Sequence, residues 1–200
     1  MARNYRMGKR AEDRERTRGR ILKATMLVHD EKGIAPATLA EIAARAGVSQ
    51  ATLSRHFPSY GELVQACGGH VWQEMRPPVP ETAAAVFAGA SGRQDRLRRL
   101  VEELDAFYAR GAHRLDLAWR DRDLMPQIDG FLRAVEAGVD ALVAEALAPG
   151  GSSRFAVRLV AALTSFRVWQ SVRRQGFGEA ETRDVLLQTL VCGLQAAETR

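Results

Sequence analysis

Three observations predict an all-α protein, with a three-helix N-terminal domain followed by a C-terminal helical bundle. Alanine, leucine, arginine and glutamate dominate the 200 residues, and all four favour helices. No run of strand length alternates apolar and polar residues. Clusters of glycine and proline divide the chain into segments of helical length. Hydrophobic residues make up 46% of the chain, which is enough for a core to form.

The N-terminal domain is predicted to open with a helix over about residues 12–32. Gly33 follows that helix as a typical C-cap. Thr38 begins a short second helix, and Glu41 three residues later completes a capping box. Gly47 ends the second helix and permits the positive φ of a tight turn.

The third helix of this domain and a connecting helix after it are predicted to begin at serine residues. Ser49 opens a short helix that closes near Phe57, and Ser59 opens another that runs to about Met75. Residues 76–80 contain three prolines, which cannot continue a helix because proline lacks the amide donor. The first domain is therefore expected to end there.

The rest of the chain is predicted to form the helical bundle, after a loose loop at residues 89–92. Apolar residues at helical spacing form a stripe from Leu97 to Tyr108. Further helices are expected over residues 113–120, 123–147, 153–175 and 179–198.

The net charge of +5 lies entirely in the first third of the chain. Residues 1–63 hold 12 lysines and arginines against 7 acidic residues, whereas residues 64–200 hold 17 of each. A polyanion such as DNA is the natural partner for the basic third, because phosphate contacts supply most non-specific nucleic-acid affinity. A solvated basic face is the alternative interpretation.

The segment from Thr38 to Phe57 has the pattern of a helix-turn-helix. Gly47 supplies the turn, Val48 fills the corner, and Leu53 faces back to the core. Short polar residues then point outward from the second helix, where they can reach base edges in the major groove of double-stranded operator DNA. The predicted DNA-contacting residues are Thr38, Ser49, Gln50, Ala51, Thr52, Ser54, Arg55, His56 and Tyr60.

Residues 18–67 resemble the N-terminal domain of the TetR family of transcriptional regulators. The resemblance is carried by Ile21-Leu22, Ala24, Gly33, Thr38, Ile42-Ala43, Ala46-Gly47-Val48-Ser49, Thr52-Leu53, His56-Phe57, Ser59, Glu62 and Leu63. The family implies homodimers, operator DNA and usually a small-molecule effector that releases the DNA. The expected division is a basic flexible arm over 1–11, a helix-turn-helix domain over 12–75, and a ligand-binding and dimerisation domain over 76–200.

Three positions depart from the family pattern. Ser54 stands where the family usually has tyrosine, Tyr60 where it has lysine, and His29 at the aromatic position of the first helix. The usual residues at the first two positions help to hold phosphates. Ser54 can still donate to a phosphate, and Tyr60 is expected to replace the missing tyrosine from the next helix. Alternatively, DNA contact is weaker and depends more on the basic arm. The alternative is a helical interaction protein whose DNA-binding head is degenerate.

Four cations precede the first predicted helix with no acidic residue among them. They are Arg3, Arg6, Lys9 and Arg10. Such an arm can enter the minor groove of DNA. A solvated tail is the alternative.

Large apolar residues of the body are the candidates for an effector pocket and a dimer interface. The predicted pocket residues are Phe107, Tyr108, Trp119, Met125, Phe131, Phe166 and Trp169. Bundles hold ligands between their helices, so a small and mainly apolar effector is expected. The predicted dimer contacts are Phe155, Leu187, Leu190, Val191 and Leu194, on two helices that form an isologous four-helix contact. The alternative is that both helices are wholly internal.

Several other classes of function find no support in the sequence. Cys67 and Cys192 are far apart and form no CxxC, so neither a disulfide framework nor a zinc site is predicted. No nucleophile, phosphate-binding or dinucleotide motif indicates an enzyme or a cofactor. No apolar run reaches the length of a membrane helix, and no secretory signal is recognised, so a cytoplasmic repressor is expected.

Overall fold

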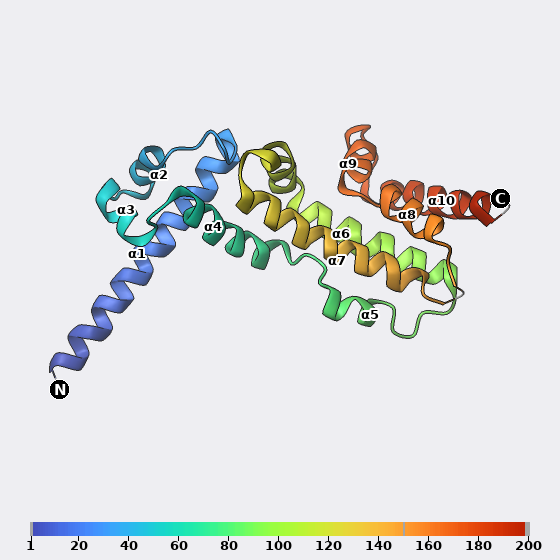
Figure 1. Cartoon of the computed structure of the whole chain (residues 1–200), viewed down its shortest axis with the longest axis horizontal. Coiled ribbons are helices and arrows are strands. Elements are labelled where there is room, and N and C mark those ends of the chain that lie inside the picture. The colour runs from blue at the N-terminus through green and yellow to red at the C-terminus, as the bar shows by residue number, and fades with distance from the viewer. Residues whose placement is uncertain (1, 150, 199–200) are drawn as a thin grey trace. The chain divides into compact units, whose positions relative to one another are not determined.

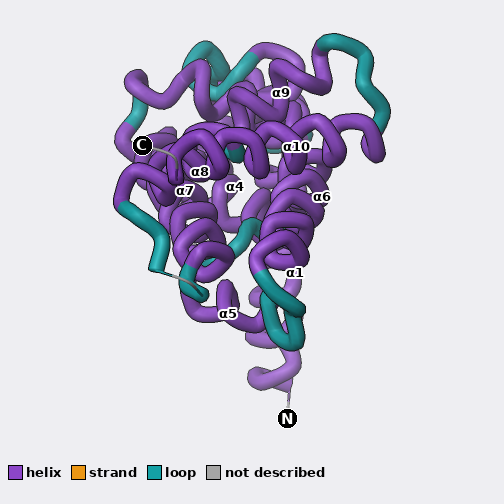
Figure 2. Tube along the Cα trace, turned by 90° about the vertical axis from the view of Figure 1, so that its right-hand side faces the viewer, coloured by secondary structure: helices purple, strands orange, loops and turns teal. Residues whose placement is uncertain are grey.

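The computed structural model describes residues 2–149 and 151–198, and every regular element in them is a helix (Figure 2). The predicted all-α class is therefore confirmed. The chain divides into two compact units, residues 1–74 with 113–132 and residues 75–112 with 133–200. We call them unit 1 and unit 2 and describe each by itself.

Unit 1 contains the helix-turn-helix. Its helices are α1 (Ala2–Lys32), α2 (Leu39–Ala46), α3 (Gln50–His56) and α4 (Tyr60–Met75), completed by the end of α6 (Arg93–Asp121), η2 (Arg122–Leu124) and the start of α7 (Pro126–Leu147). α2 and α3 lie against the C-terminal half of α1 (Figure 1). Fully buried Ile21, Ile42 and Leu53 bring one side chain from each of these helices into a common core. This core fixes which face of α3 remains in solvent.

Unit 2 is built from the remaining helices. They are η1 (Pro80–Thr82), α5 (Ala83–Val86), α8 (Arg154–Leu163), α9 (Phe166–Arg174) and α10 (Glu179–Glu198), with the first part of α6 and the later part of α7. Within this unit α6 and α7 run side by side, and Arg96 of α6 donates to the Ala146 carbonyl of α7 at 3.3 Å. α8 packs on α10, where Gly193 allows Leu159 and Leu163 to approach.

An aromatic cluster forms the core of unit 2. Phe107 and Tyr108 on α6 contact each other, and Tyr108 also contacts Phe166 and Trp169 on α9, with ring centroids 5.1 to 5.6 Å apart. The Trp169 indole donates at 2.8 Å to the buried carboxylate of Asp105. Asp105 also accepts from Arg183 of α10 at 3.3 Å, so this single carboxylate joins three helices.

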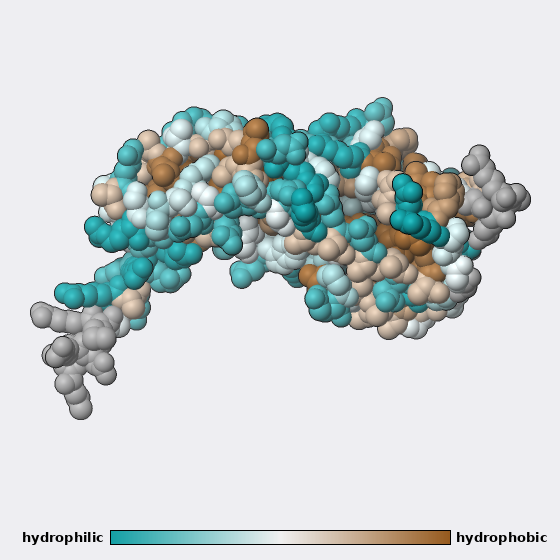
Figure 3. Space-filling model, viewed as in Figure 1, coloured by the Kyte–Doolittle hydropathy of each residue, from teal (hydrophilic) through white to brown (hydrophobic). Residues whose placement is uncertain are grey.

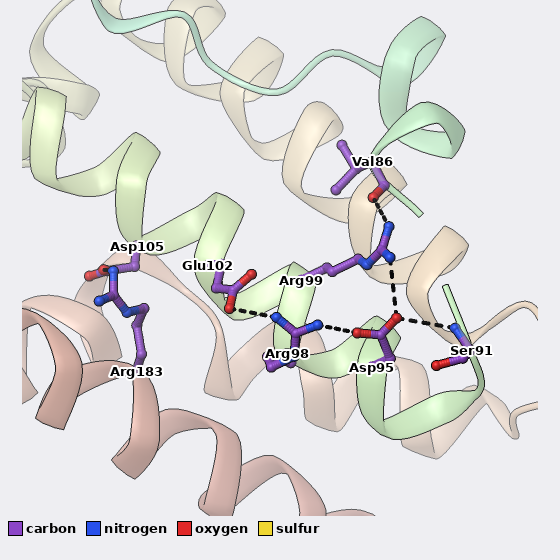
Figure 4. Close-up of polar contacts among 8 residues, drawn as sticks. All are labelled: Val86, Ser91, Asp95, Arg98, Arg99, Glu102, Asp105 and Arg183. Atoms are coloured by element: carbon purple, nitrogen blue, oxygen red, sulfur yellow. Dashed lines mark hydrogen bonds and ion pairs between the residues drawn. The ribbon is translucent and has the colours of Figure 1, made fainter. Parts of the chain in front are cut away.

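A polar network fixes the start of α6 within unit 2 (Figure 4). Asp95 accepts from the Ser91 amide at 3.1 Å, and this bond caps the first turn of the helix. Arg98 pairs with Asp95 and with Glu102, at 2.9 Å for the second pair. Arg99 donates to the Val86 carbonyl at 3.4 Å. The network holds the loop after α5 against α6.

The structure corrects four predicted boundaries. α1 begins at Ala2 rather than near residue 12, because alanine, arginine, lysine and methionine dominate the preceding residues and none of them is proline. α6 is continuous across the break expected before residue 113, since Gly111 lets the Met75 side chain pack against the helix. The helix predicted over 153–175 is divided into α8 and α9, because Thr164 and Ser165 favour caps. α7 begins at Pro126 rather than at residue 123, because η2 occupies residues 122–124. In addition, η1 and α5 form between the predicted break and the predicted loop, where no helix was predicted.

Candidate DNA interface and neighbouring cavity

The turn between α2 and α3 has the geometry that the sequence predicts. The Glu41 amide donates to Thr38 Oγ1 at 3.3 Å, and Glu41 Oε2 accepts from the Thr38 amide at 3.1 Å, so the capping box is complete. Gly47 has φ of 63°, in the left-handed region that favours glycine. Ser49 Oγ accepts from the Thr52 amide at 3.1 Å and caps α3. These caps fix the direction of α3.

The outer face of α3 presents most of the predicted DNA-contacting residues to solvent. On α3 and at its N-cap, Ser49, Gln50, Ala51, Ser54 and Arg55 are exposed, while Thr52 and His56 are half-buried. Thr38, which caps α2, is exposed as well. Leu53 is fully buried and anchors the opposite face. A helix anchored in this way offers short polar side chains to the edges of base pairs.

Positive charge surrounds the end of α3, and part of it comes from residues that the sequence interpretation missed. Partial burial, followed by the charges of Arg14, Arg18 and Arg55, lowers the pKa of His56 below its ordinary value. The Arg18 guanidinium also stacks 4.4 Å from the centre of the Phe57 ring. Arg14 and Arg18 are four residues apart on α1, and this spacing could have revealed a shared helical face.

The predicted arm is helical where its backbone is described, because it forms the start of α1. This corrects the expectation of a flexible segment. Lys9 and Arg10 are exposed on that helix. The side chains of Arg3 and Arg6 lie outside the described part of the structure. Figure 3 shows a hydrophilic surface along the projecting stem of α1.

Tyr60 contacts groups inside unit 1 rather than facing outward. Its hydroxyl donates to the Ile34 carbonyl and lies 3.0 Å from Nε2 of His29. Because the hydroxyl has one proton, Nε2 of His29 must be the donor in the second bond. Nδ1 of His29 then carries a lone pair toward the Cys67 thiol, 3.9 Å away. The expected phosphate contact by Tyr60 thus competes with an internal role.

The turn before α2 is also held from the end of α6. Asp121 is buried, and one of its oxygens accepts from the amides of Ile34 and Ala35 at 2.8 and 2.9 Å. Burial by itself raises the pKa of Asp121, but the bonds from Arg120, Ala35 and Ile34 outweigh it and hold the pKa below its ordinary value. Gly33, with φ of 104°, leaves the space that Arg120 occupies. The approach to the helix-turn-helix is therefore fixed by a carboxylate far away in sequence.

A cavity of about 450 Å³ lies within unit 1, behind the helix-turn-helix. Four helices contribute to it, with Met26 and His29 from α1, Gly68 from α4, Leu117 from α6 and Phe131 from α7. Of the predicted pocket residues, Phe131 alone is among those that line it. Its partner Trp72 stands edge-on at 5.7 Å between ring centroids.

The other predicted pocket residues have different positions. Four of them form the aromatic cluster of unit 2, where each ring is buried and packs against the next: Phe107, Tyr108, Phe166 and Trp169. Trp119 lies beneath the Arg122 guanidinium, 4.9 Å from the ring centre, and Met125 is half-buried just before α7. The sequence predicted a cavity at these large aromatic side chains, but the side chains themselves fill the space between the helices.

The predicted dimer residues divide between the inside and the surface of unit 2. Leu190 and Leu194 are buried in the protomer, so for them the wholly internal alternative applies. Leu187 and Val191 are half-buried, and Phe155 is 54% exposed. The side chains that remain available for a partner are therefore fewer than predicted.

Two features are absent from the described residues. No helix among them is long and apolar enough to span a membrane. No group of three or more histidine, cysteine, aspartate or glutamate side chains in the same part of the chain is arranged to hold a metal ion.

The fold and the exposed, capped α3 are those of a helix-turn-helix domain of the kind found in DNA-binding transcriptional regulators. Residues 21–67 match the family model of the bacterial regulatory proteins of the tetR family. This match confirms, for residues 21–67, the resemblance to the N-terminal domain of the TetR family that the sequence shows. No curated protein sequence matches the chain.

Solved structures show the same fold over most of the chain. NalD, the secondary repressor of the MexAB-OprM multidrug efflux pump in Pseudomonas aeruginosa, is 22% identical, with 91% of this chain and 97% of NalD covered and a TM-score of 0.65. LfrR from Mycobacterium smegmatis, in complex with proflavine, is 23% identical, with 89% and 96% covered and a TM-score of 0.54. SCO7518 from Streptomyces coelicolor, described as a transcriptional regulator, is 21% identical, with 86% and 96% covered and a TM-score of 0.59.

Proposed function

We propose that this protein is a homodimeric repressor that binds operator DNA and is released by a small, mainly apolar ligand. The observation that carries the proposal is the outer face of α3, where Gln50, Ser54 and Arg55 are exposed beside the positive charge of Arg14 and Arg18. Polar side chains on a fixed helix can discriminate bases, and nearby cations can hold the phosphates.

The first test concerns base reading by Gln50. Its amide can make paired hydrogen bonds to an adenine edge, so Gln50→Ala should weaken operator binding by about 1–3 kcal/mol. Binding would be measured by electrophoretic shift on a fragment of the protein's own promoter and on random DNA. Gln65→Ala on α4 is the matched control. An equal loss on both DNAs would remove Gln50 from sequence recognition.

The second test concerns the phosphate contacts of α1. Arg14→Ala should reduce the salt dependence of DNA binding by about 0.9 in the logarithmic slope, because one phosphate contact is lost. Deleting residues 1–10 should flatten the slope further if Lys9 and Arg10 also contact phosphates. An unchanged slope in both variants would leave α1 a solvated helix.

The third test concerns the dimer. Figure 3 shows hydrophobic surface on the C-terminal part of unit 2. Phe155 of α8 is exposed. Phe155→Arg together with Val191→Arg should weaken self-association at least about tenfold, which corresponds to about 1.4 kcal/mol. Light scattering at several concentrations measures this. An unchanged dimer would place the interface elsewhere, and a wild-type monomer would contradict the proposal itself.

The effector part of the proposal is supported by the ligand-bound LfrR structure, which shows that a protein with this fold can hold a small aromatic molecule. A ligand releases DNA only if it prefers the conformation that binds DNA less well. A typical coupling lowers operator affinity by about 1–3 kcal/mol.

A second candidate function is a helical interaction protein whose head no longer binds DNA. It is favoured by the internal hydrogen bond of Tyr60 and by Ser54, which leaves this face with a hydroxyl in place of a phenol. Electrophoretic shifts with genomic fragments at low salt distinguish the two functions. Absence of any shift would favour the interaction protein.

A further inference from the structure

The cavity of unit 1 has a charge-neutral lining. Asp30 and Arg114 are the charged side chains that border it, and Asp30 Oδ1 lies 3.7 Å from Arg114 Nε. Arg114 also pairs with Glu74, and Asp30 lies 3.8 Å from His113. Burial lowers the pKa of His29 to about 4, so its ring in the cavity wall is neutral near pH 7. Arg114 is shared between Asp30 and Glu74, so no cation of this lining is left to compensate the charge of an anionic ligand.

The remainder of the lining is mainly apolar and suits aromatic groups. Met26, Val71, Leu117 and Ile128 contribute aliphatic or thioether surface, and Phe131 contributes a ring. Thioether sulfur and aromatic rings both pack favourably against an aromatic ligand. A volume of about 450 Å³ lies within the usual range for small-molecule sites.

The cavity also borders the structure that positions the helix-turn-helix. Ile34 lies in its wall, and the backbone of Ile34 is held by Tyr60 on its carbonyl and by Asp121 on its amide. His29, which donates to Tyr60, lies in the same wall. An occupant would therefore contact the residues that set the entry into α2.

We infer that this cavity is a binding site for a neutral, mainly apolar aromatic molecule. The inference rests on the proposed function, because it takes the occupant to be the effector. It assigns the effector to unit 1, directly behind the helix-turn-helix, and not to the aromatic cluster of unit 2. An anionic molecule binds poorly, because it loses its hydration without gaining an unpaired cation.

A matched pair of fluorescent probes tests the preference for a neutral ligand. N-phenyl-1-naphthylamine is neutral, and 8-anilinonaphthalene-1-sulfonate has the same two ring systems with an added sulfonate. In fluorescence titrations of the full-length protein, the neutral probe should saturate one site per chain and bind at least about tenfold more tightly than the sulfonate. Failure of the neutral probe to bind, or equal binding by both probes, would overturn the inference.

Two neighbouring glycines of α4 locate the site. A Cβ on Gly68 would lie 3.6 Å from Phe131 Cδ2, at the cavity, whereas a Cβ on Gly69 would meet nothing within 4 Å. Gly68→Leu should therefore lower the affinity for N-phenyl-1-naphthylamine at least about tenfold, and Gly69→Leu should leave it unchanged. Gly68→Ala, whose methyl makes an ordinary contact, should lower it to a smaller degree if the leucine variant fails to fold. Equal affinities in the Gly68 and Gly69 variants would overturn the site.

Operator binding in the same samples separates this inference from the proposed function. Wild type and the Gly69 variant should shift operator DNA equally without probe, and the probe should weaken the shift in both. In the Gly68 variant the probe should leave the shift at the value which that variant has without probe. The neutral probe could bind as expected in both the probe comparison and the glycine comparison and yet leave DNA binding unchanged. That result would support the site and contradict release by ligand. If wild type without probe does not bind operator DNA, the proposed function is contradicted, but the binding site is not.

Discussion

The two units differ in how they use large apolar side chains. In unit 2 four aromatic rings from α6 and α9 fill the core, and Tyr108 is in contact with three of its neighbours. In unit 1 Phe131 and its neighbours leave about 450 Å³ open, beside Gly68. A cavity in this protein thus follows from missing side-chain volume and not from aromatic content. The following four changes test this comparison.

The largest effect is expected for Phe107→Ala in the filled core. Phe107 is fully buried, so its removal creates a cavity and should lower the free energy of unfolding by about 3–5 kcal/mol. Chemical denaturation of the variant and of wild type measures the loss. Phe177→Ala, at a ring that is 41% exposed, is the control and should cost less than about 1 kcal/mol. Similar losses in both variants would mean that the cluster is not closely packed.

The second effect is a pH dependence that comes from His29 at the cavity wall. Its pKa is about 4 in the folded protein against 6.5 ordinarily, so the unfolded chain takes up this proton first. The contribution of His29 to the free energy of unfolding is therefore complete above pH 6.5 and is lost as the pH falls toward 4. The loss amounts to up to about 3 kcal/mol.

His29→Gln isolates this contribution from the other titrating groups. Unfolding free energies of wild type and variant would be compared at pH 7 and at pH 4.5. Wild type should lose more stability than the variant over this interval. Parallel pH profiles would show that His29 is accessible to protons in the folded protein.

The third effect concerns the polar edge of the filled core. Trp169→Phe keeps the ring packing but removes the indole N–H that Asp105 accepts, so we expect a loss of about 1.5–3 kcal/mol. Trp72→Phe, at a half-buried ring beside the cavity, should cost less. Thermal or chemical unfolding of the two variants decides between them. A smaller loss for Trp169→Phe would indicate that Arg183 alone satisfies Asp105.

The smallest effect is expected at the open wall. Gly68→Ala and Gly69→Ala should each stabilise α4 by up to about 1 kcal/mol, because alanine is the better helix former. The gain at Gly68 should be the larger one, since its methyl also becomes buried at an ordinary distance from Phe131. A loss of stability in Gly68→Ala would show that the cavity has no room for a methyl group at this position.

The sequence predicted the local features of unit 1 well, because each depends on residues close together in the chain. Thr38 with Glu41, Gly47 and Ser49 each act within one helical turn, and their patterns are specific. The start of α1 was missed, because helix propensity had to be weighed against the repulsion of a cationic segment.

The rest of the site depends on contacts between distant segments, which a single sequence does not display. Nothing near Asp121 predicts its bonds to Ile34 and Ala35. Tyr60 was placed toward phosphate because it follows α3, yet its hydroxyl turns inward to the Ile34 carbonyl. Leu190 and Leu194 carry the same apolar pattern whether the face is covered by α8 or by a second subunit. Only the tertiary packing shows that both side chains are buried within the protomer.

The Asp121 contact has a consequence for recombination between regulators of this kind. The unit that presents α3 comes from two separate stretches of the chain, 1–74 and 113–132. A chimera that transplants the first stretch alone would bring Ile34 and Ala35 without the carboxylate that receives their amides. Transfer of the second stretch as well would restore it. Exchange of DNA specificity between such proteins by a single crossover near residue 75 would therefore deliver a recognition helix without its support, whereas a double crossover preserves both.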